Sequence, residues 1–320
     1  MANTAPENLG VTMAKDFLSV LDLSAGEVAR LLDLARQMKA DRRLGRQAPT
    51  AHALAGRHVA MLFEKPSLRT RSTFEIAVKE LGAETLHVPS EFADGTREPL
   101  EDVARNLERW VHAVVVRTYA HEKVASMAAV APKLHVINAL SDEQHPCQAL
   151  ADMMTLQEHW GSLRGRRIAF VGDGNNVATS LAHATALLGV QFHVASPPGY
   201  ELPADVVDTA RRVARDGAGI RLFGEPCEAI RGVDAVYTDV WTSMGQERET
   251  DERKQVFASY QVDGRLMAAA APGALFMHCL PAHRGEEVTS DVLDSAASVV
   301  LDQAENRLHT HKALLFMLLS

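Results

Sequence analysis

Short runs rich in β-branched residues alternate with helical patterns along almost the whole chain. Parallel strands need a crossover between them, and a helix usually provides it, so this alternation is typical of an α/β fold. We therefore expect two domains, each a mainly parallel sheet flanked by helices. The expected strands lie at residues 57–63, 85–88, 112–117, 134–140, 168–172, 191–196, 220–224, 235–241 and 274–280.

Capping residues indicate where individual helices begin and end. Ser24 can cap the helix that follows it, and Glu27 completes a capping box with it. Gly82 ends a second helical pattern that begins near Arg71. A length of 320 residues corresponds to roughly two domains. We expect the helix at residues 148–160, with the basic turn after it, to connect them.

The net charge and the cysteine content limit the expected binding partners and the expected cellular compartment. The net charge of −8 disfavours nucleic acid and anionic membranes as main partners. No apolar run approaches the ~18–20 residues that span a bilayer, and the N-terminus lacks a secretory signal pattern. The cysteines are odd in number and far apart, which predicts no disulfide framework and a reducing cytoplasm. They are Cys147, Cys227 and Cys279.

The segment MLFEKPSLRTRSTFE, residues 61–75, passes from an apolar strand pattern through a loop into a helix. A helix N-terminus offers free backbone N–H groups and favours anions. Ser67 and Thr70 add hydroxyl groups, and the guanidinium of Arg69 matches phosphate oxygens. The spacing of a Walker loop is absent. The segment predicts an anion site, although a capped helix with solvated arginines fits the same residues.

Two further polar clusters follow predicted strands. Arg117 comes directly after an apolar strand, where ligands of open α/β sheets bind, although this feature alone favours a surface arginine at a strand end. His145 and Gln148 precede a helix and offer hydrogen bonds. His145 and Cys147 alone do not make a metal site, because two ligands two residues apart are too few.

The turn VGDGNN at residues 171–176 resembles a dinucleotide-binding turn only in part. Val177 stands where the third glycine of that fingerprint belongs, so a nucleotide-dependent dehydrogenase is disfavoured. Asn175 and Asn176 are interpreted as amide donors for a small polar ligand or as caps of the next helix. Asp239 ends a later strand and could meet an amino group, or it could satisfy a turn.

The C-terminal part contains a cysteine at a strand end and a possible anion ligand. Cys279 could be a reactive thiol, a hydrogen-bonding wall or a buried small side chain. The set His278, Cys279, His283 and Glu286 lacks a recognised ligand spacing, so we expect no metal. Arg307 lies near the start of the last helix, where, taken singly, it is interpreted as a surface residue. Together the clusters fit a substrate that bears phosphate and a small amino acid.

Six motifs in this order resemble those of the ornithine carbamoyltransferase family, and the resemblance covers the chain from about Leu18 to its end. The first two are shared by carbamoyltransferases in general, and the fourth and fifth resemble the ornithine branch. They are FEKPSLRTRSTFE, HPCQALAD, VGDGNN, YTDVWTSMGQE, MHCLPAHRGEEVT and DQAENRLH.

The resemblance implies that carbamoyl phosphate and L-ornithine give L-citrulline and phosphate, without a metal or an organic cofactor. It implies a cytoplasmic homotrimer of arginine biosynthesis, with citrulline breakdown as the alternative direction. The first domain would be 1–150 with the last helix, about 303–320, and the second 151–302. The matched carbamoyl phosphate positions are Ser67, Leu68, Arg69, Thr70, Arg117, His145, Gln148, Cys279, Leu280 and Arg307. The matched ornithine positions are Asn176, Asp239, Ser243 and Met244, and those expected in catalysis are Arg117, His145, Asp239 and Cys279.

The chain departs from the family pattern at two places. Leu68 stands where the family often has threonine, so a backbone N–H group remains and a hydroxyl is lost. Ala93 aligns with a glutamine that reaches a neighbouring subunit's site in the family, and Thr96 or Arg97 are its candidate substitutes. The alternatives are a carbamoyltransferase for putrescine or N-acetylornithine and a non-catalytic binding protein.

Overall fold

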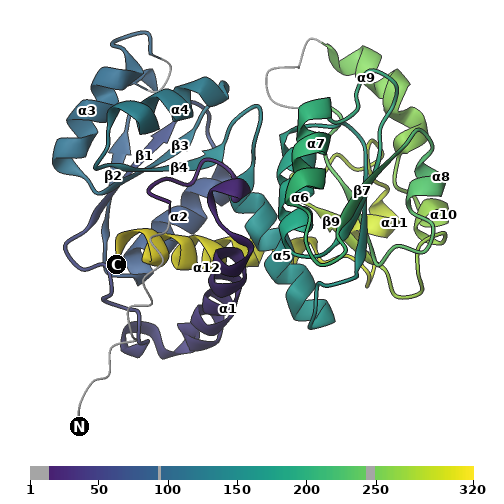
Figure 1. Ribbon diagram of the computed structural model, residues 1–320, viewed down its shortest axis with the longest axis horizontal. Coiled ribbons are helices and arrows are strands. Elements are labelled where there is room, and N and C mark those ends of the chain that lie inside the picture. The colour runs from purple at the N-terminus through teal and green to yellow at the C-terminus, as the bar shows by residue number, and fades with distance from the viewer. Residues whose placement is uncertain (1–13, 93–94, 243–248) are drawn as a thin grey trace.

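The computed structural model describes residues 14–92, 95–242 and 249–320. The chain forms two lobes that lie side by side (Figure 1). The first holds a parallel sheet in the order β2-β1-β3-β4. Its strands are β1 (His58–Phe63), β2 (Glu84–Val88), β3 (Ala113–Arg117) and β4 (His135–Leu140). Its helices include α1 (Ala25–Asp41), α2 (Leu68–Glu80), α3 (Leu100–Trp110) and α4 (His121–Val130).

The second lobe holds a parallel sheet in the order β7-β6-β5-β8-β9. Its strands are β5 (Arg167–Val171), β6 (Gln191–Ala195), β7 (Gly219–Phe223), β8 (Ala235–Thr238) and β9 (Leu275–His278). Two longer helices, α6 (Asn176–Leu187) and α7 (Ala204–Val213), cover one face. Four shorter ones lie mainly around the other: α8 (Pro226–Ala229), α9 (Thr250–Phe257), α10 (Gly264–Met267) and α11 (Ser290–Leu293).

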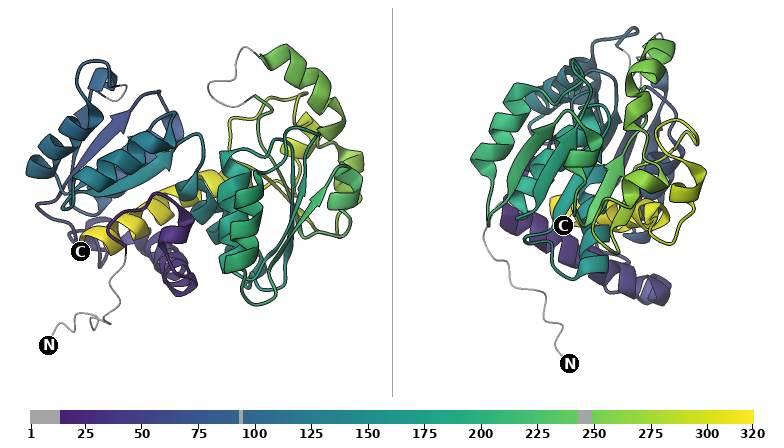
Figure 2. Two further views of the ribbon diagram at one scale, coloured as in Figure 1. Left: turned by 45° about the horizontal axis from the view of Figure 1, so that its top comes forward. Right: turned by 90° about the vertical axis from the view of Figure 1, so that its right-hand side faces the viewer.

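Two helices join the lobes. The chain crosses from the first lobe to the second through α5 (Pro146–Trp160), and α12 (Val300–Leu319) returns to pack against α1, α2 and α5. The left view of Figure 2 shows α12 in yellow beneath the first sheet. One apolar core therefore runs from the lower face of the first sheet through α5 to the α6 face of the second. A second core lies under α3 and α4.

Side chains that alternate between the two faces of each strand explain this layered packing. In β1, Val59 and Met61 face the core shared with α2, while Ala60 and Leu62 face α3 and α4. A parallel strand that is covered on both faces reads as a continuous apolar run, as β1 does. No helix among the described residues is both long enough and apolar enough to cross a membrane.

The expected fold class is confirmed: both sheets are parallel, helices flank them, and the last helix contacts the first lobe. Ser24 and Glu27 form the predicted capping box on α1. The predicted start of α2 is wrong, because the helix begins at Leu68 with Ser67 as its cap. The division of the chain at residue 150 stays a prediction, since α5 runs across that point.

Candidate active site

A cavity of about 950 Å³ lies between the two lobes, where the carboxyl ends of strands from both sheets face each other. Its volume is within the range typical of small-molecule sites. Most of the residues predicted from the sequence line it, and they come from both halves of the chain. These lining residues are Ser67, Leu68, Arg69, Arg117, His145, Asn176, Asp239, Cys279, Leu280 and Arg307.

Buried Thr70 is the centre of a cationic cluster in the first half of the cavity. Its Oγ1 accepts hydrogen bonds from Nη2 of Arg307 at 2.6 Å and from Nη1 of Arg117 at 3.4 Å. Ser67 caps α2 by accepting the N–H of Thr70. The side chain of Leu68 is 78% exposed on the first turn of α2, next to Arg69. The guanidinium groups of Arg117 and Arg307 are thus directed to the N-terminus of α2, and the charge of Arg69 acts on both.

The guanidinium groups are held in an unfavourable electrostatic setting. Burial, and next the charge of Arg307, lower the pKa of Arg117 to about 10, with a smaller effect from Arg69. The interpretation of Arg307 as a surface residue is wrong, because its side chain is buried, and this burial lowers its pKa as well. Within the described residues, Nε of Arg307 is buried and has no hydrogen-bond partner. Bringing an anion into the cluster would relieve this repulsion and supply the missing acceptor.

His145 and Gln148 lie at the start of α5, and His145 lines the cavity near the charges of Arg117 and Arg307. His145 is the N-cap residue, and its N–H donates to Oγ of Ser180. Burial first, and then the charges of Arg307 and Arg117, hold the pKa of His145 well below its usual value. His145 is therefore a neutral imidazole at pH 7. Gln148 is buried one turn later on the same face of the helix.

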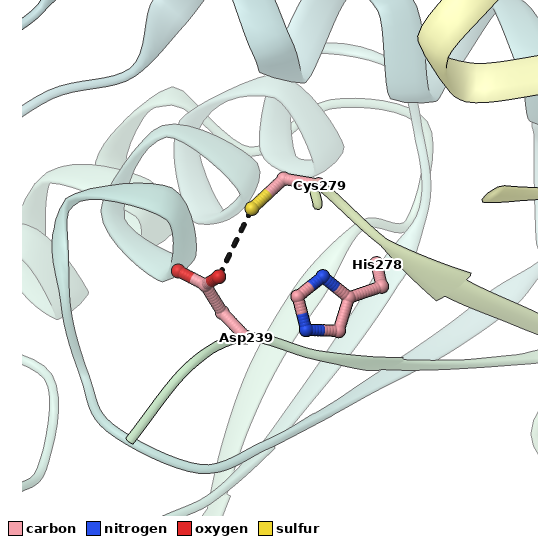
Figure 3. Close-up of side chains that lie close together, drawn as sticks. All are labelled: Asp239, His278 and Cys279. Atoms are coloured by element: carbon pink, nitrogen blue, oxygen red, sulfur yellow. Dashed lines mark hydrogen bonds between the residues drawn. The ribbon is translucent and has the colours of Figure 1, made fainter. Parts of the chain in front are cut away.

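The second half of the cavity contains a buried carboxylate beside a thiol (Figure 3). Asp239 follows β8 and accepts Sγ–H of Cys279 at 3.0 Å and Nδ2–H of Asn175 at 2.8 Å. Burial first, and then the charge of Asp239, raise the pKa of Cys279 well above its usual value. Cys279 is therefore a neutral thiol that donates to Asp239, and it is not a base at neutral pH. Asp239 is the buried carboxylate of this half of the cavity.

His278 lies close to this pair but does not complete a preformed metal site. Its Nδ1 accepts the N–H of Leu280 at 2.8 Å, and its Nε2 is 3.1 Å from the buried carboxylate of Glu287. Both ring nitrogens are thus engaged, which leaves Asp239 and Cys279 as two ligands where most sites need more. Leu280 adopts φ 59°, a backbone conformation that directs the chain past Cys279 into the cavity wall.

Two of the proposed ornithine positions and one family departure cannot be placed. Ser243, Met244 and Ala93 lie outside the described residues. Asn176 is the first residue of α6, and its Nδ2 donates to the carbonyl of Ser141 at 2.6 Å. Asn176 therefore ties the second lobe to the loop before α5 in the first.

Two further residues line the cavity, and one of them, Asn175, is the helix cap that the sequence offered as an alternative. Asn175 caps α6 by accepting the N–H groups of Val177 and Ala178, and its amide also positions Asp239. The asparagine pair in VGDGNN was a visible signal for this role. His183 lines the cavity from the apolar face of α6, and burial lowers its pKa to about 4. A lone histidine on such a helix gives no sequence signal.

The glycines of the same turn are explained by packing. A Cβ on Gly174 would lie 2.4 Å from the backbone of Glu201, so only glycine fits there. Gly172 has φ 142° at the end of β5. The Gly-x-Gly pattern thus follows from backbone geometry.

Comparison with known families agrees with this geometry. Residues 15–158 match the carbamoyl-P binding domain of aspartate/ornithine carbamoyltransferases, and residues 164–318 match the Asp/Orn binding domain. The chain belongs to the aspartate/ornithine carbamoyltransferase family. The predicted family resemblance and enzyme class are confirmed.

Named relatives of this carbamoyltransferase cover nearly all of the chain. This chain is 49% identical over 309 residues to ornithine carbamoyltransferase of Methanospirillum hungatei, and the match covers 96% of this chain and 100% of that protein. Identity to the enzyme of Parafrankia sp. is 51% over 308 residues, covering 96% of both chains. The structure of ornithine carbamoyltransferase from Pyrococcus furiosus superposes with TM-score 0.91 at 45% identity, covering 97% of this chain and 98% of that one.

Proposed function

We propose that this protein transfers the carbamoyl group of carbamoyl phosphate to the side-chain amine of L-ornithine, giving L-citrulline and phosphate. The observation that carries the proposal is the pairing of two unlike half-sites in one cavity. Arg69, Arg117 and Arg307 gather at one end, and Asp239 with Cys279 lies at the other. The named ornithine carbamoyltransferases at about half identity support the choice of ornithine.

The phosphate group of the donor is assigned to the N-terminus of α2. Backbone N–H groups after Ser67, the hydroxyl of Thr70 and the three guanidinium groups would bind its oxygens. Leu68 contributes a backbone N–H group there. The cluster also stabilises phosphate as the leaving group, since negative charge grows on it when the carbon–oxygen bond breaks.

The carbamoyl group is assigned to Arg117, His145 and Gln148. Negative charge develops on the carbonyl oxygen as the amine attacks, and a preorganised donor there is worth roughly 3–4 kcal/mol. Arg117 is the charged donor, and neutral His145 can donate one N–H bond without carrying a second positive charge. Cys279 and Leu280 close the wall on the opposite side.

The amine acceptor is assigned to the second half of the cavity. An amine of pKa about 10 must lose a proton before its nitrogen can attack the carbonyl carbon. Asp239 is placed to attract the ammonium group and orient it, and the proton passes to Asp239 or to the leaving phosphate. We assign the α-amino and α-carboxylate groups of ornithine to Asn176, Ser243 and Met244 on the family resemblance.

We also propose the finer properties that accompany this family resemblance. The chain divides into a carbamoyl phosphate domain, 1–150 with 303–320, and an ornithine domain, 151–302. The protein is a cytoplasmic homotrimer of arginine biosynthesis. The assembly is supported by apolar Ile76 on α2 and Leu86 on the edge strand β2, both exposed on neighbouring elements of the first lobe. Three free cysteines agree with a reducing compartment.

The test is product formation from carbamoyl phosphate with ornithine, putrescine, N-acetylornithine and aspartate compared side by side. We expect turnover with ornithine alone, because Asp239 suits a free amine and the remaining polar groups suit an amino acid. Preference for another amine would leave the donor half of the proposal intact and overturn the acceptor half. Binding of carbamoyl phosphate without turnover of any amine would favour a binding protein.

A further inference from the structure

The carboxylate of Asp152 joins three elements of the fold. Asp152 is not one of the residues assigned to either substrate. It is fully buried on α5. Its Oδ1 accepts Nε2–H of Gln148 at 2.9 Å and Nε2–H of Gln303 at 2.8 Å, and its Oδ2 accepts the hydroxyl of Tyr237 at 3.2 Å. Gln148, Gln303 and Tyr237 come from α5, α12 and β8.

The orientation of the Gln303 amide is determined by a backbone group. Its Oε1 accepts the N–H of His278 at 3.0 Å, and a backbone N–H can only donate. The NH₂ group of Gln303 must therefore face Asp152. Oδ1 of Asp152 accepts this hydrogen bond from Gln303. Any second group within hydrogen-bonding distance of Oδ1 must therefore be a donor as well.

The same constraint orients Gln148. Its NH₂ group must face Oδ1, so its Oε1 is the atom directed away from Asp152. This oxygen is buried and has no hydrogen-bond partner among the residues that the structure describes. A buried acceptor without a donor is costly, about 1–3 kcal/mol, which points to a donor supplied by a ligand.

We propose that Asp152 is a positioning residue that presents Oε1 of Gln148 as the acceptor for the N–H group of the bound carbamoyl moiety. The inference rests on the proposed function and assigns this network a selective role. An acyl phosphate with a methyl group in place of NH₂ has no N–H to offer. With the Gln148 amide reversed, its NH₂ group would face the NH₂ group of the substrate, and two donors would oppose each other.

The proposed role of Asp152 requires a hydrogen-bond acceptor and does not require a negative charge. Burial raises its pKa to about 6, against the three hydrogen bonds that favour the ionised form. An asparagine could keep an oxygen toward both glutamines and donate its NH₂ group to the hydroxyl of Tyr237. Because Gln303 demands an acceptor, the opposite orientation of that asparagine would place two donors together.

The experiment measures dissociation constants of carbamoyl phosphate and acetyl phosphate by calorimetry for the unaltered protein and three variants. In Asp152→Leu the preference for carbamoyl phosphate should fall about tenfold, while the affinity for acetyl phosphate stays within twofold. Asp152→Asn should keep the preference, because the acceptor remains. Tyr237→Phe is the matched control, since it removes only the bond to Oδ2. If Asp152→Leu does not fold, Asp152→Ala replaces it.

Three outcomes would overturn the positioning role of Asp152, and only the last of them would also overturn the proposed function. An unchanged preference in Asp152→Leu or Asp152→Ala would overturn the positioning role. A loss of preference in Asp152→Asn as large as in Asp152→Leu would also overturn it, because the charge would then be the relevant property. An unaltered protein that binds no carbamoyl phosphate would overturn the proposed function and this inference together.

Discussion

The two halves of the cavity differ in how complete they are without substrate. In the first half, Arg117 and Arg307 repel each other, share one hydroxyl of Thr70 and have lowered pKa values. In the second half, Asp239 already accepts hydrogen bonds from Asn175 and Cys279. The first half is therefore a cationic site in which like charges repel one another until an anion binds. The second half is a polar surface whose hydrogen bonds are already formed without substrate.

This difference suggests an order of binding. Carbamoyl phosphate entering first would neutralise the repulsion among the guanidinium groups through its phosphate and bring in the carbonyl that the amine attacks. The amine half needs no such completion from its own residues.

The largest expected effect tests the cationic half. Arg117→Met keeps the apolar stem of the side chain and removes the charged donor to the carbonyl oxygen. We expect kcat to fall about a thousandfold, as for a lost oxyanion donor. The melting temperature should stay the same or rise, because the repulsion with Arg307 is removed. Steady-state kinetics and thermal unfolding check both, and unchanged turnover would exclude Arg117 from catalysis.

A smaller effect tests the acceptor half alone. Asp239→Asn retains an oxygen that can accept Sγ–H of Cys279 but removes the negative charge that attracts an amine. We expect kcat/KM for ornithine to fall about a hundredfold. The dissociation constant of carbamoyl phosphate, measured by calorimetry, should stay within twofold. A parallel loss of carbamoyl phosphate affinity would show that the halves are not separable.

Acid should destabilise the fold through buried neutral histidines. The pKa values of His145 and His311 lie well below 6.5, because burial and the charge of Arg307 disfavour the protonated rings. The pKa of His183 is lowered to about 4. Below pH 6.5 the unfolded chain binds protons that the folded chain does not, so stability falls as pH falls, by roughly 1.4 kcal/mol per pH unit for each histidine.

The buried Asp152 opposes this trend over part of the same range. Its pKa is raised to about 6, so between pH 3.8 and 6 the folded chain holds a proton that the unfolded chain has lost. One carboxylate offsets only one histidine. Urea unfolding at pH 7.5, 6.5 and 5.5 should therefore show falling stability, and His183→Leu should flatten the slope. Equal stability at all three values would contradict the neutral histidines.

The smallest expected effect concerns the thiol. Because the pKa of Cys279 is raised well above its usual value, the group is a hydrogen-bond donor to Asp239 at neutral pH. Cys279→Ser preserves a donor of similar shape, and we expect kcat to fall less than tenfold. Cys279→Ala removes the donor and should cost more. A loss in Cys279→Ser as large as in Asp239→Asn would show that the sulfur itself is required.

Much of the fold was predictable because local pattern and tertiary packing agree. The strands β1 and β3 are continuous apolar runs that β-branched residues favour, and Ser24 with Glu27 marks the start of α1. The start of α2 was predicted too late, because Ser67 is separated from the apolar stripe by Leu68 and two arginines. Its capping hydrogen bond, unlike periodicity, is visible only in three dimensions.

The sequence alone determined that both sheets are parallel and flanked by helices, and that Arg117 and Asp239 lie at strand ends. Those properties depend on spacing and side-chain type, which are local. The tertiary structure decided that Arg307 is buried beside Thr70, that Asn175 positions Asp239, and that Asp152 joins α5 to α12 and β8. These contacts join residues far apart in the chain, and only the packing of the two lobes around α5 and α12 brings them together.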